Sequence, residues 1–228
     1  MSETDSFIDE VTEEVRRDRL FSLMRRYGWI VVVAILLIVG GAAFNEWRKA
    51  QDRAAAQAFG DAILSALSAD GRAARAGALD TVAAPGPDAA AVVDLLASAE
   101  RSAEDTGAAA TRLLELADNP DTARIYRRLA TLKAVALPGS GLSIEDRRAR
   151  LDPLASQPGL VRLLAEEQLA MIDLETGARA AALDRLSALA TDAEATSPLR
   201  RRVAQMIVAL GEEVPDMPGA TGETGIGQ

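Results

Sequence analysis

The sequence contains neither cysteine nor histidine. The chain therefore forms no disulfide, and it has no thiol nucleophile, no imidazole base and none of the commonest ligands of zinc. Lysine is scarce as well, because Lys49 and Lys133 are the only two, so lysine-based covalent catalysis has little to draw on. These absences exclude most schemes of enzyme chemistry. They leave the compartment open, since a helical domain of this size is stable without disulfides.

Aromatic residues are also few, at 4% of a chain that is 49% hydrophobic. The apolar content is mostly alanine and leucine, which favour helices over strands, so we expect an all-α fold. The net charge is −9, and no long basic stripe lies outside the flanks of the apolar segment described next. Nucleic-acid binding requires such a stripe, so we expect no nucleic-acid partner.

One apolar segment interrupts this charged chain. Residues 28–44 carry no charge, and residues 30–39 form a continuous apolar run. Trp29 and Trp47 lie 18 positions apart, which is about 27 Å of helix and close to the thickness of the hydrocarbon layer of a bilayer. We therefore predict a transmembrane helix over residues 27–47 in contact with the lipid bilayer. Its predicted interface anchors are aromatic and basic residues: Tyr27, Trp29, Trp47, Arg25, Arg26 and Arg48.

The segment is either a cleaved signal or a retained anchor. Gly40, Gly41, Ala42 and Ala43 could serve as a cleavage site, but the long charged stretch before the segment and its spanning length favour retention. Before the span lie five arginines, and behind it lie Arg48, Lys49 and Arg53. This bias predicts a single-pass protein with its N-terminus in the cytoplasm and its large C-terminal part exported.

Two parts of this region have alternative interpretations. The small residues Gly40, Gly41, Ala42 and Ala43 either allow another transmembrane helix to approach closely or simply face lipid. Residues 1–26 form either a short amphipathic helix on the cytoplasmic side or a solvated tail. Behind Trp47 the helical pattern continues without a break, so the span is expected to run directly into the first helix of the next domain.

The remainder of the chain repeats. Four pairs of an apolar residue followed by alanine recur along it: Leu96-Ala97, Leu129-Ala130, Leu169-Ala170 and Val203-Ala204. The longest interval, between the second and third pairs, contains LPGSGLSI, which predicts a loop. The other two intervals are close to the period of about 34 residues that is typical of two-helix tetratricopeptide (TPR) repeats. We therefore predict a TPR-like α-solenoid of antiparallel helix pairs over residues 48–211, followed by a disordered tail over residues 212–228. A plain helical bundle is the alternative, since alanine-rich helices produce chance Leu-Ala pairs.

No catalytic constellation emerges from the motifs. The sequence PGSG at 138–141 is no nucleophile elbow, and the adjacent pairs Glu166-Glu167 and Glu212-Glu213 point apart on a helix, so they do not converge on a metal. We expect no enzyme, no cofactor and no metal. Repeat arrays bind partner proteins on the surface lined by the first helix of each pair. Here the candidate groove residues are Arg127, Thr131, Glu167 and Met171, although such a methionine is also ordinary packing.

The layout resembles a known family. The opening DSFIDEVTEEVRRDRLFSLMRRYGW, the pair Trp47-Arg48 behind the span and the repeat over 169–189 are similar to the alphaproteobacterial branch of the YfgM-like proteins, the ancillary subunits of the SecYEG translocon. The resemblance implies a protein of the bacterial inner membrane whose repeat domain lies in the periplasm and contacts translocon subunits and periplasmic chaperones. The alternative hypothesis is an accessory structural subunit of another inner-membrane complex, such as a respiratory assembly.

Overall fold

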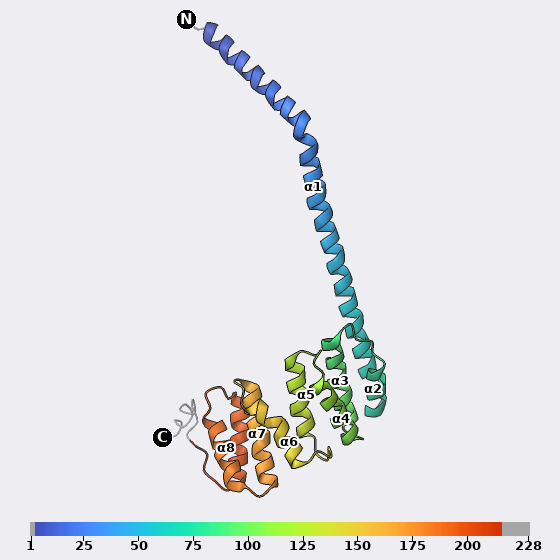
Figure 1. The fold of residues 1–228 in the computed structure, drawn as a ribbon, viewed down its shortest axis with the longest axis vertical. Helices are drawn as coiled ribbons and strands as arrows, with labels where there is room; N and C mark the ends of the chain where they lie inside the picture. Colours follow the sequence, from blue (N-terminus) through green and yellow to red (C-terminus); the bar gives the residue numbers. More distant parts are fainter. Residues whose placement is uncertain (1–2, 216–228) are drawn as a thin grey trace, which may run out of the picture. The chain divides into compact units, whose positions relative to one another are not determined.

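The protein is all-α over the residues that its structure, a computed structural model, describes (Figure 1). These are residues 3–215, with side chains from residue 24 onward except that of Val31. Of the predicted tail over residues 212–228, the part from residue 216 onward lies outside them. The chain divides into two compact units, Met1–Ala58 and Phe59–Gln228.

Nine helices follow one another within residues 3–215, and no strand occurs there. Their bounds are α1 Glu3–Leu67, α2 Arg72–Asp80, α3 Pro87–Arg101, α4 Thr106–Asp118, α5 Arg124–Ala136, α6 Ile144–Ala155, α7 Leu160–Glu175, α8 Arg179–Thr191 and α9 Ser197–Ala209. The predicted loop LPGSGLSI separates α5 from α6, where Gly139 and Gly141 both take positive φ.

Helix α1 is continuous through the apolar segment and beyond it. The prediction that this segment runs without a break into the first helix of the next domain is therefore confirmed. The last two turns of α1 belong to the second unit, where Phe59, Ile63 and Ala66 pack against α2 and α3.

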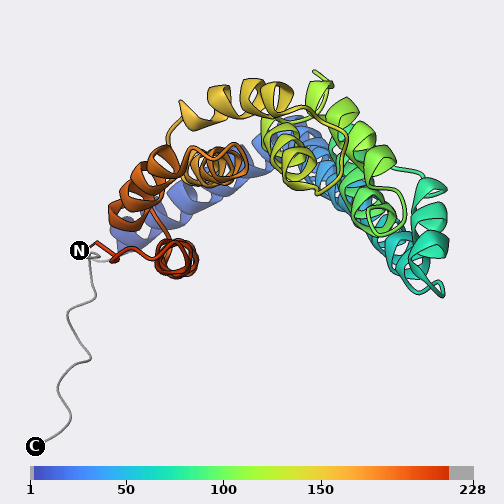
Figure 2. The ribbon, with the colours of Figure 1, turned by 90° about the horizontal axis from the view of Figure 1, so that it is seen from below.

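The helices of the second unit follow one another along an array (Figure 2), and they enclose four small cores instead of one. Core A joins α1, α2 and α3; core B joins α3, α4 and α5; core C joins α5, α6 and α7; core D joins α7, α8 and α9. Helices α3, α5 and α7 each contribute to two cores, one on either side. Each core is therefore formed by helices that follow one another in the chain, and within this unit the helices pack mainly against those next to them in sequence.

The repeated Leu-Ala pairs lie on alternate helices. Leu96-Ala97 lies on α3, Leu129-Ala130 on α5, Leu169-Ala170 on α7 and Val203-Ala204 on α9. The alanines at 97, 130 and 170 are completely buried, whereas on α9 Val203 is the buried member of its pair. The completely buried residue of the pair is thus a small one on three of the four helices, as the repeat predicted.

A longer repeat underlies the unequal spacings of these pairs. Helices α4 and α5, which begin at Thr106 and Arg124, recur as α8 and α9, which begin at Arg179 and Ser197. The first and last residues of α4 and α5 lie the same number of positions before the first and last residues of α8 and α9, and we call this spacing the long repeat. The same spacing relates Pro85-Gly86, before α3, to Pro158-Gly159, before α7.

The long repeat extends to the cores. The buried Leu113 and Leu116 of core B correspond to Leu186 and Leu189 of core D. We call α2–α5 the first half and α6–α9 the second half of this unit. The packing between α5 and α6, which joins the halves, is less extensive than that between successive helices inside either half.

Helix α9 is the last helix within the described residues 3–215, and its outer surface differs from that of α5. On α5, Leu132 and Val135 are buried in core C against α6 and α7. Their counterparts in the long repeat are Gln205 and Val208 on α9; both are exposed, and the exposed fraction of Val208 is 61%. Val214, behind α9, packs against core D.

Two glycines close helices at related places. Gly177 follows α7 with φ 77°, and the chain turns there through hydrogen bonds from Gly177 N–H to the Leu174 carbonyl (3.1 Å) and from Ala178 N–H to the Asp173 carbonyl (2.8 Å). Gly211 closes α9 in the same way, with φ 80°. Left-handed backbone of this kind strains every residue that has a Cβ atom.

Replacing Gly177 by alanine should therefore lower the free energy of unfolding by about 1 kcal/mol, entirely through backbone strain. No atom lies within 4 Å of the added Cβ. Urea denaturation of the detergent-solubilised chain, followed by circular dichroism, measures the change. Gly77→Ala is the matched control, since Gly77 is exposed inside α2 and equally free of neighbours. The control should gain stability, by up to about 1 kcal/mol, and a loss of stability in both variants would contradict the argument.

Candidate functional site

The apolar part of α1 is long and apolar enough to cross a membrane. Its mean hydropathy reaches 2.4, and none of that window is buried inside the protein. The side chains of Leu36, Leu37 and Ile38 are about seven-tenths exposed. A core helix of a soluble protein would bury these residues, so contacts among the described residues do not account for this apolar surface.

The predicted interface anchors are all exposed: Arg25, Arg26, Tyr27, Trp29, Trp47 and Arg48. The guanidinium of Arg26 lies 5.9 Å from the centre of the Tyr27 ring, and the rings of Phe44 and Trp47 lie 6.0 Å apart. Each end of the apolar part therefore carries an exposed aromatic residue beside a cation, which suits the polar headgroup layer of a bilayer.

The small residues Gly40, Gly41, Ala42 and Ala43 are exposed. A Cβ atom added at Gly40 or Gly41 would meet no atom within 4 Å. Glycine inside a helix costs about 1 kcal/mol relative to alanine. The packing of the described chain gives no reason for these two glycines.

The four predicted groove residues lie on α5 and α7. On α5, the Thr131 hydroxyl donates to the Arg127 carbonyl (3.0 Å), and Arg127 Nε donates to the Ala117 carbonyl at the end of α4 (3.1 Å). On α7, Met171 is 38% exposed, whereas Glu167 is only 6% exposed. Two N–H groups of Arg202 on α9 donate to the Glu167 carboxylate, one of them at 2.6 Å, so this carboxylate serves contacts inside the fold.

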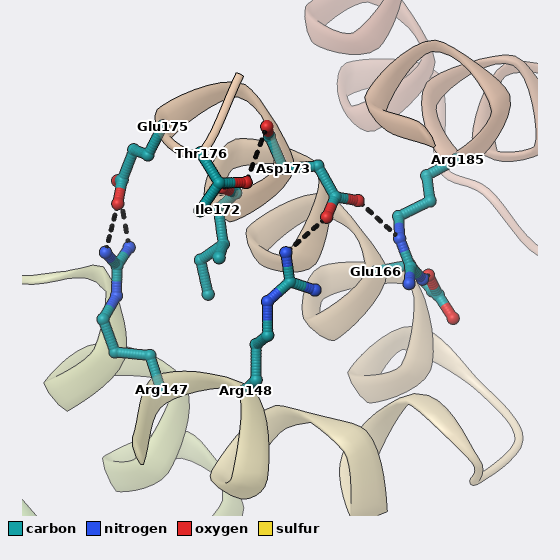
Figure 3. A network of polar contacts seen from close by, with 8 residues as sticks. All are labelled: Arg147, Arg148, Glu166, Ile172, Asp173, Glu175, Thr176 and Arg185. Carbon is teal, nitrogen blue, oxygen red and sulfur yellow. Dashed lines mark hydrogen bonds and ion pairs between the residues drawn. The ribbon is translucent and has the colours of Figure 1, made fainter. Parts of the chain in front are cut away.

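A network of arginines and carboxylates connects α6, α7 and α8 (Figure 3). At its centre the buried carboxylate of Asp173 on α7 accepts from Arg148 of α6 at 2.5 Å and from Arg185 Nε of α8 at 2.9 Å. Arg185 also binds Glu166, which precedes Asp173 on α7. Glu166 and Glu167 thus face different helices, as their adjacent positions predicted.

The first half contains the corresponding network. Arg75 of α2 binds Glu100 of α3 at 2.9 Å, and the long repeat carries these two residues onto Arg148 and Asp173. Arg112 of α4, the counterpart of Arg185, binds Asp94 of α3 at 2.7 Å and also Asp80 of α2. In both halves an arginine network therefore ties three successive helices together.

These pairs shift the pKa values of their carboxyl groups. Burial alone would raise the pKa of Asp80, but hydrogen bonds from Arg112 and Arg101 outweigh it and hold this pKa below the usual value of 3.8. The hydrogen bond from Arg75 is the main reason why the pKa of Glu100 lies below its usual value of 4.5. In both cases the guanidinium favours the charged carboxylate.

Stability should consequently depend on pH only in acid. A carboxyl group whose pKa is lowered by folding stabilises the fold above its unfolded pKa, and that contribution is lost as pH falls through the folded value. We expect the melting temperature to stay level from about pH 8 to 6, where histidine would titrate, because the chain has none. It should then fall below pH 4.5, the usual pKa of Glu100.

Thermal melts at a series of pH values, followed by circular dichroism, check this expectation. Arg75→Gln should make the acid-induced loss of stability shallower, because it removes the main cause of the lowered pKa of Glu100. A melting temperature that already falls near neutral pH would contradict the assignment of this stabilisation to carboxylates paired with arginines.

Each network borders a groove at a corresponding place. The first, of about 680 Å³, is lined from α3 and α4 and includes Arg112, Leu116 and Asn119. The second, of about 330 Å³, is lined from α7 and α8 and includes the counterparts Arg185, Leu189 and Asp192. Each groove is lined by two arginines, Arg101 and Arg112 in the first and Arg162 and Arg185 in the second, and all four are already paired with carboxylates.

Comparison with family models, curated proteins and solved structures gives no match. The chain's own residues therefore carry the functional argument. Within the described side chains no three acidic residues are grouped so as to hold a metal ion. The arginine networks were not predicted from the sequence, although the long repeat that relates Arg75 to Arg148 and Arg112 to Arg185 is visible in it.

Proposed function

We propose that this protein is a membrane-anchored module that binds other proteins. The apolar part of α1 serves as a retained single-pass anchor with the N-terminus in the cytoplasm, and the helices from α2 onward form a TPR-like array in the periplasm. The observation that carries the proposal is the sharing of α3, α5 and α7 between successive cores. Arrays built in this way have a large surface relative to their length and use it for binding proteins.

The partners proposed are subunits of the Sec translocon and periplasmic chaperones. This assignment rests on the resemblance of the N-terminal stretch, the pair Trp47-Arg48 and the 169–189 repeat to the YfgM-like proteins. An anchor followed directly by a helical array holds the binding surface near the membrane, where exported chains emerge.

Protease protection tests the topology. Protease added to intact spheroplasts should degrade the chain behind Arg48 and spare a short N-terminal fragment. Complete protection would place the array in the cytoplasm and would refute the proposed location. Crosslinking in native membranes followed by mass spectrometry tests the partners, and recovery of respiratory subunits without translocon subunits would refute the export role.

A second function, that of an accessory subunit docked inside the membrane, is favoured by one observation. Gly40 and Gly41 expose helix backbone that no part of the described chain covers, as expected where another transmembrane helix packs. Replacing residues 1–44 by a cleavable export signal separates the two functions. If the released array still captures the partners, they bind the array; if capture is lost, the partners bind the membrane segment.

A further inference from the structure

Ion pairing is unevenly distributed over the second unit. Among the described residues from Phe59 onward, every arginine pairs with a carboxylate except those at five positions: Arg124, Arg127, Arg128, Arg200 and Arg201. All of these lie on α5 or α9, and so does Lys133, which likewise has no carboxylate partner among the described residues. Neither helix contains an acidic residue. We call Arg124, Arg127 and Arg128 the α5 cluster, and Arg200 and Arg201 the α9 cluster.

The two clusters occupy corresponding positions. The long repeat carries Arg127 and Arg128 onto Arg200 and Arg201, and all four lie in the first two turns of α5 or α9. Positive charge near the start of a helix opposes the helix dipole, and this effect weakens beyond the first turn. The dipole of α5 or α9 therefore gives no favourable reason for cations at these positions in either half.

Contacts inside the fold use little of this charge. Arg127 Nε donates to the carbonyl of Ala117 at the end of α4, and Arg200 donates to the carbonyl of Asp192 behind α8 (3.3 Å). Each of these contacts uses one of the five N–H donors of its guanidinium group. Arg128 donates to the Gln157 side chain, and Arg201 is exposed and has no hydrogen-bond partner among the described residues.

We propose that the α5 and α9 clusters bind an acidic segment of a partner protein. The inference rests on the proposed protein-binding function and specifies the chemistry of the partner. Guanidinium groups bind carboxylates through pairs of parallel hydrogen bonds, and such charge-assisted bonds are roughly twice as strong as neutral ones. A segment rich in aspartate and glutamate therefore supplies what these arginines lack.

An extended protein segment fits these clusters better than an anionic bilayer does. Arg127, Arg128 and Arg200 are partly buried. A single carboxylate side chain reaches a partly buried guanidinium more readily than the headgroups of a broad bilayer.

The test uses the full chain in nanodiscs of zwitterionic phosphatidylcholine. The probe is a fluorescent synthetic peptide of alternating glutamate and serine, and its counterpart has glutamine for glutamate. Fluorescence anisotropy should show binding of the glutamate peptide only, with an affinity that falls as salt rises. The double variant Arg128→Gln and Arg201→Gln should weaken this binding about tenfold.

Two variants keep the test specific. Arg72→Gln with Arg179→Gln removes the same charge from exposed arginines that already pair with Glu100 and Glu212, so binding should change by less than about twofold. Arg201→Gln alone disturbs no described contact and should weaken binding about threefold. If the two double variants lost the same amount of peptide affinity, only the overall charge of the protein would matter, and the proposal would be overturned.

The remaining outcomes separate this inference from the proposed function. Binding of the wild-type chain to phosphatidylglycerol vesicles but not to the glutamate peptide would identify lipid as the ligand and overturn the inference. If the chain with Arg128→Gln and Arg201→Gln still captures its native partners in membranes, the inference is wrong while the binding module stands. If the wild-type chain captures no partner protein in membranes, the proposed protein-binding function is itself refuted.

Discussion

Replacement of Asp173 by asparagine is expected to lower the free energy of unfolding by about 2–4 kcal/mol. The residue is 3% exposed and its carboxylate is the shared partner of Arg148 and Arg185, which come from the helices on either side of α7. Asparagine keeps the size of the side chain but leaves two guanidiniums without this countercharge. Both arginine side chains are about one-third exposed, and water therefore moderates the loss toward the lower end of the range.

Urea denaturation of the solubilised chain measures this loss, and Asp118→Asn is its control. Asp118 also pairs with an arginine of α6, Arg150, but its side chain is 63% exposed. Exposed pairs contribute about 1 kcal/mol or less, so the control should change stability little. The backbone contacts that close α7 are kept in both variants. Comparable losses would show that burial does not set the strength of these pairs.

Leu186→Ala should have a similarly large effect, lowering stability by about 2–5 kcal/mol. Leu186 is completely buried in core D, among residues of α7, α8 and α9. Because the packing between α5 and α6 is less extensive than that inside either half, the loss should fall mainly on the second half. Unfolding should then cease to be a single two-state transition.

Hydrogen–deuterium exchange of the solubilised chain locates that loss. Amides of α7, α8 and α9 should exchange faster in the variant, while those of α3 and α4 keep their protection. Leu113→Ala is the matched variant, since Leu113 holds the corresponding place in core B, and it should give the reverse pattern. Uniform acceleration in both variants would mean that the two halves unfold as one.

The sequence predicted those features that depend on local pattern. The helical content follows from the alanine and leucine composition, and the buried positions of Ala97, Ala130 and Ala170 follow from their recurrence in the chain. The loop between α5 and α6 follows from Pro138 and the glycines after it, because these residues end helices. Local pattern also predicted an apolar segment long enough to span a membrane.

Features that depend on distant pairing were not predicted. Asp173 meets Arg148 of the preceding helix, and Glu167 meets Arg202 of α9. No periodicity within one helix indicates such partners. Glu167 was expected at a groove because it lies on the first helix of a repeat. Its burial depends on the arginine that α9 places against it, and this pairing is a property of the assembled fold.

The polar residue on α9 has a consequence for truncated forms of this chain. Gln205 on α9 stands where Leu132 stands on α5, so one of the two apolar positions that α5 buries in core C is polar on α9, while Val208 keeps the other one apolar. A gene truncated after α5 would encode a protein ending in the exposed pair Leu132 and Val135, which is a surface prone to self-association. Helices α6 and α7 therefore act as the cover that keeps this surface of the first half away from solvent.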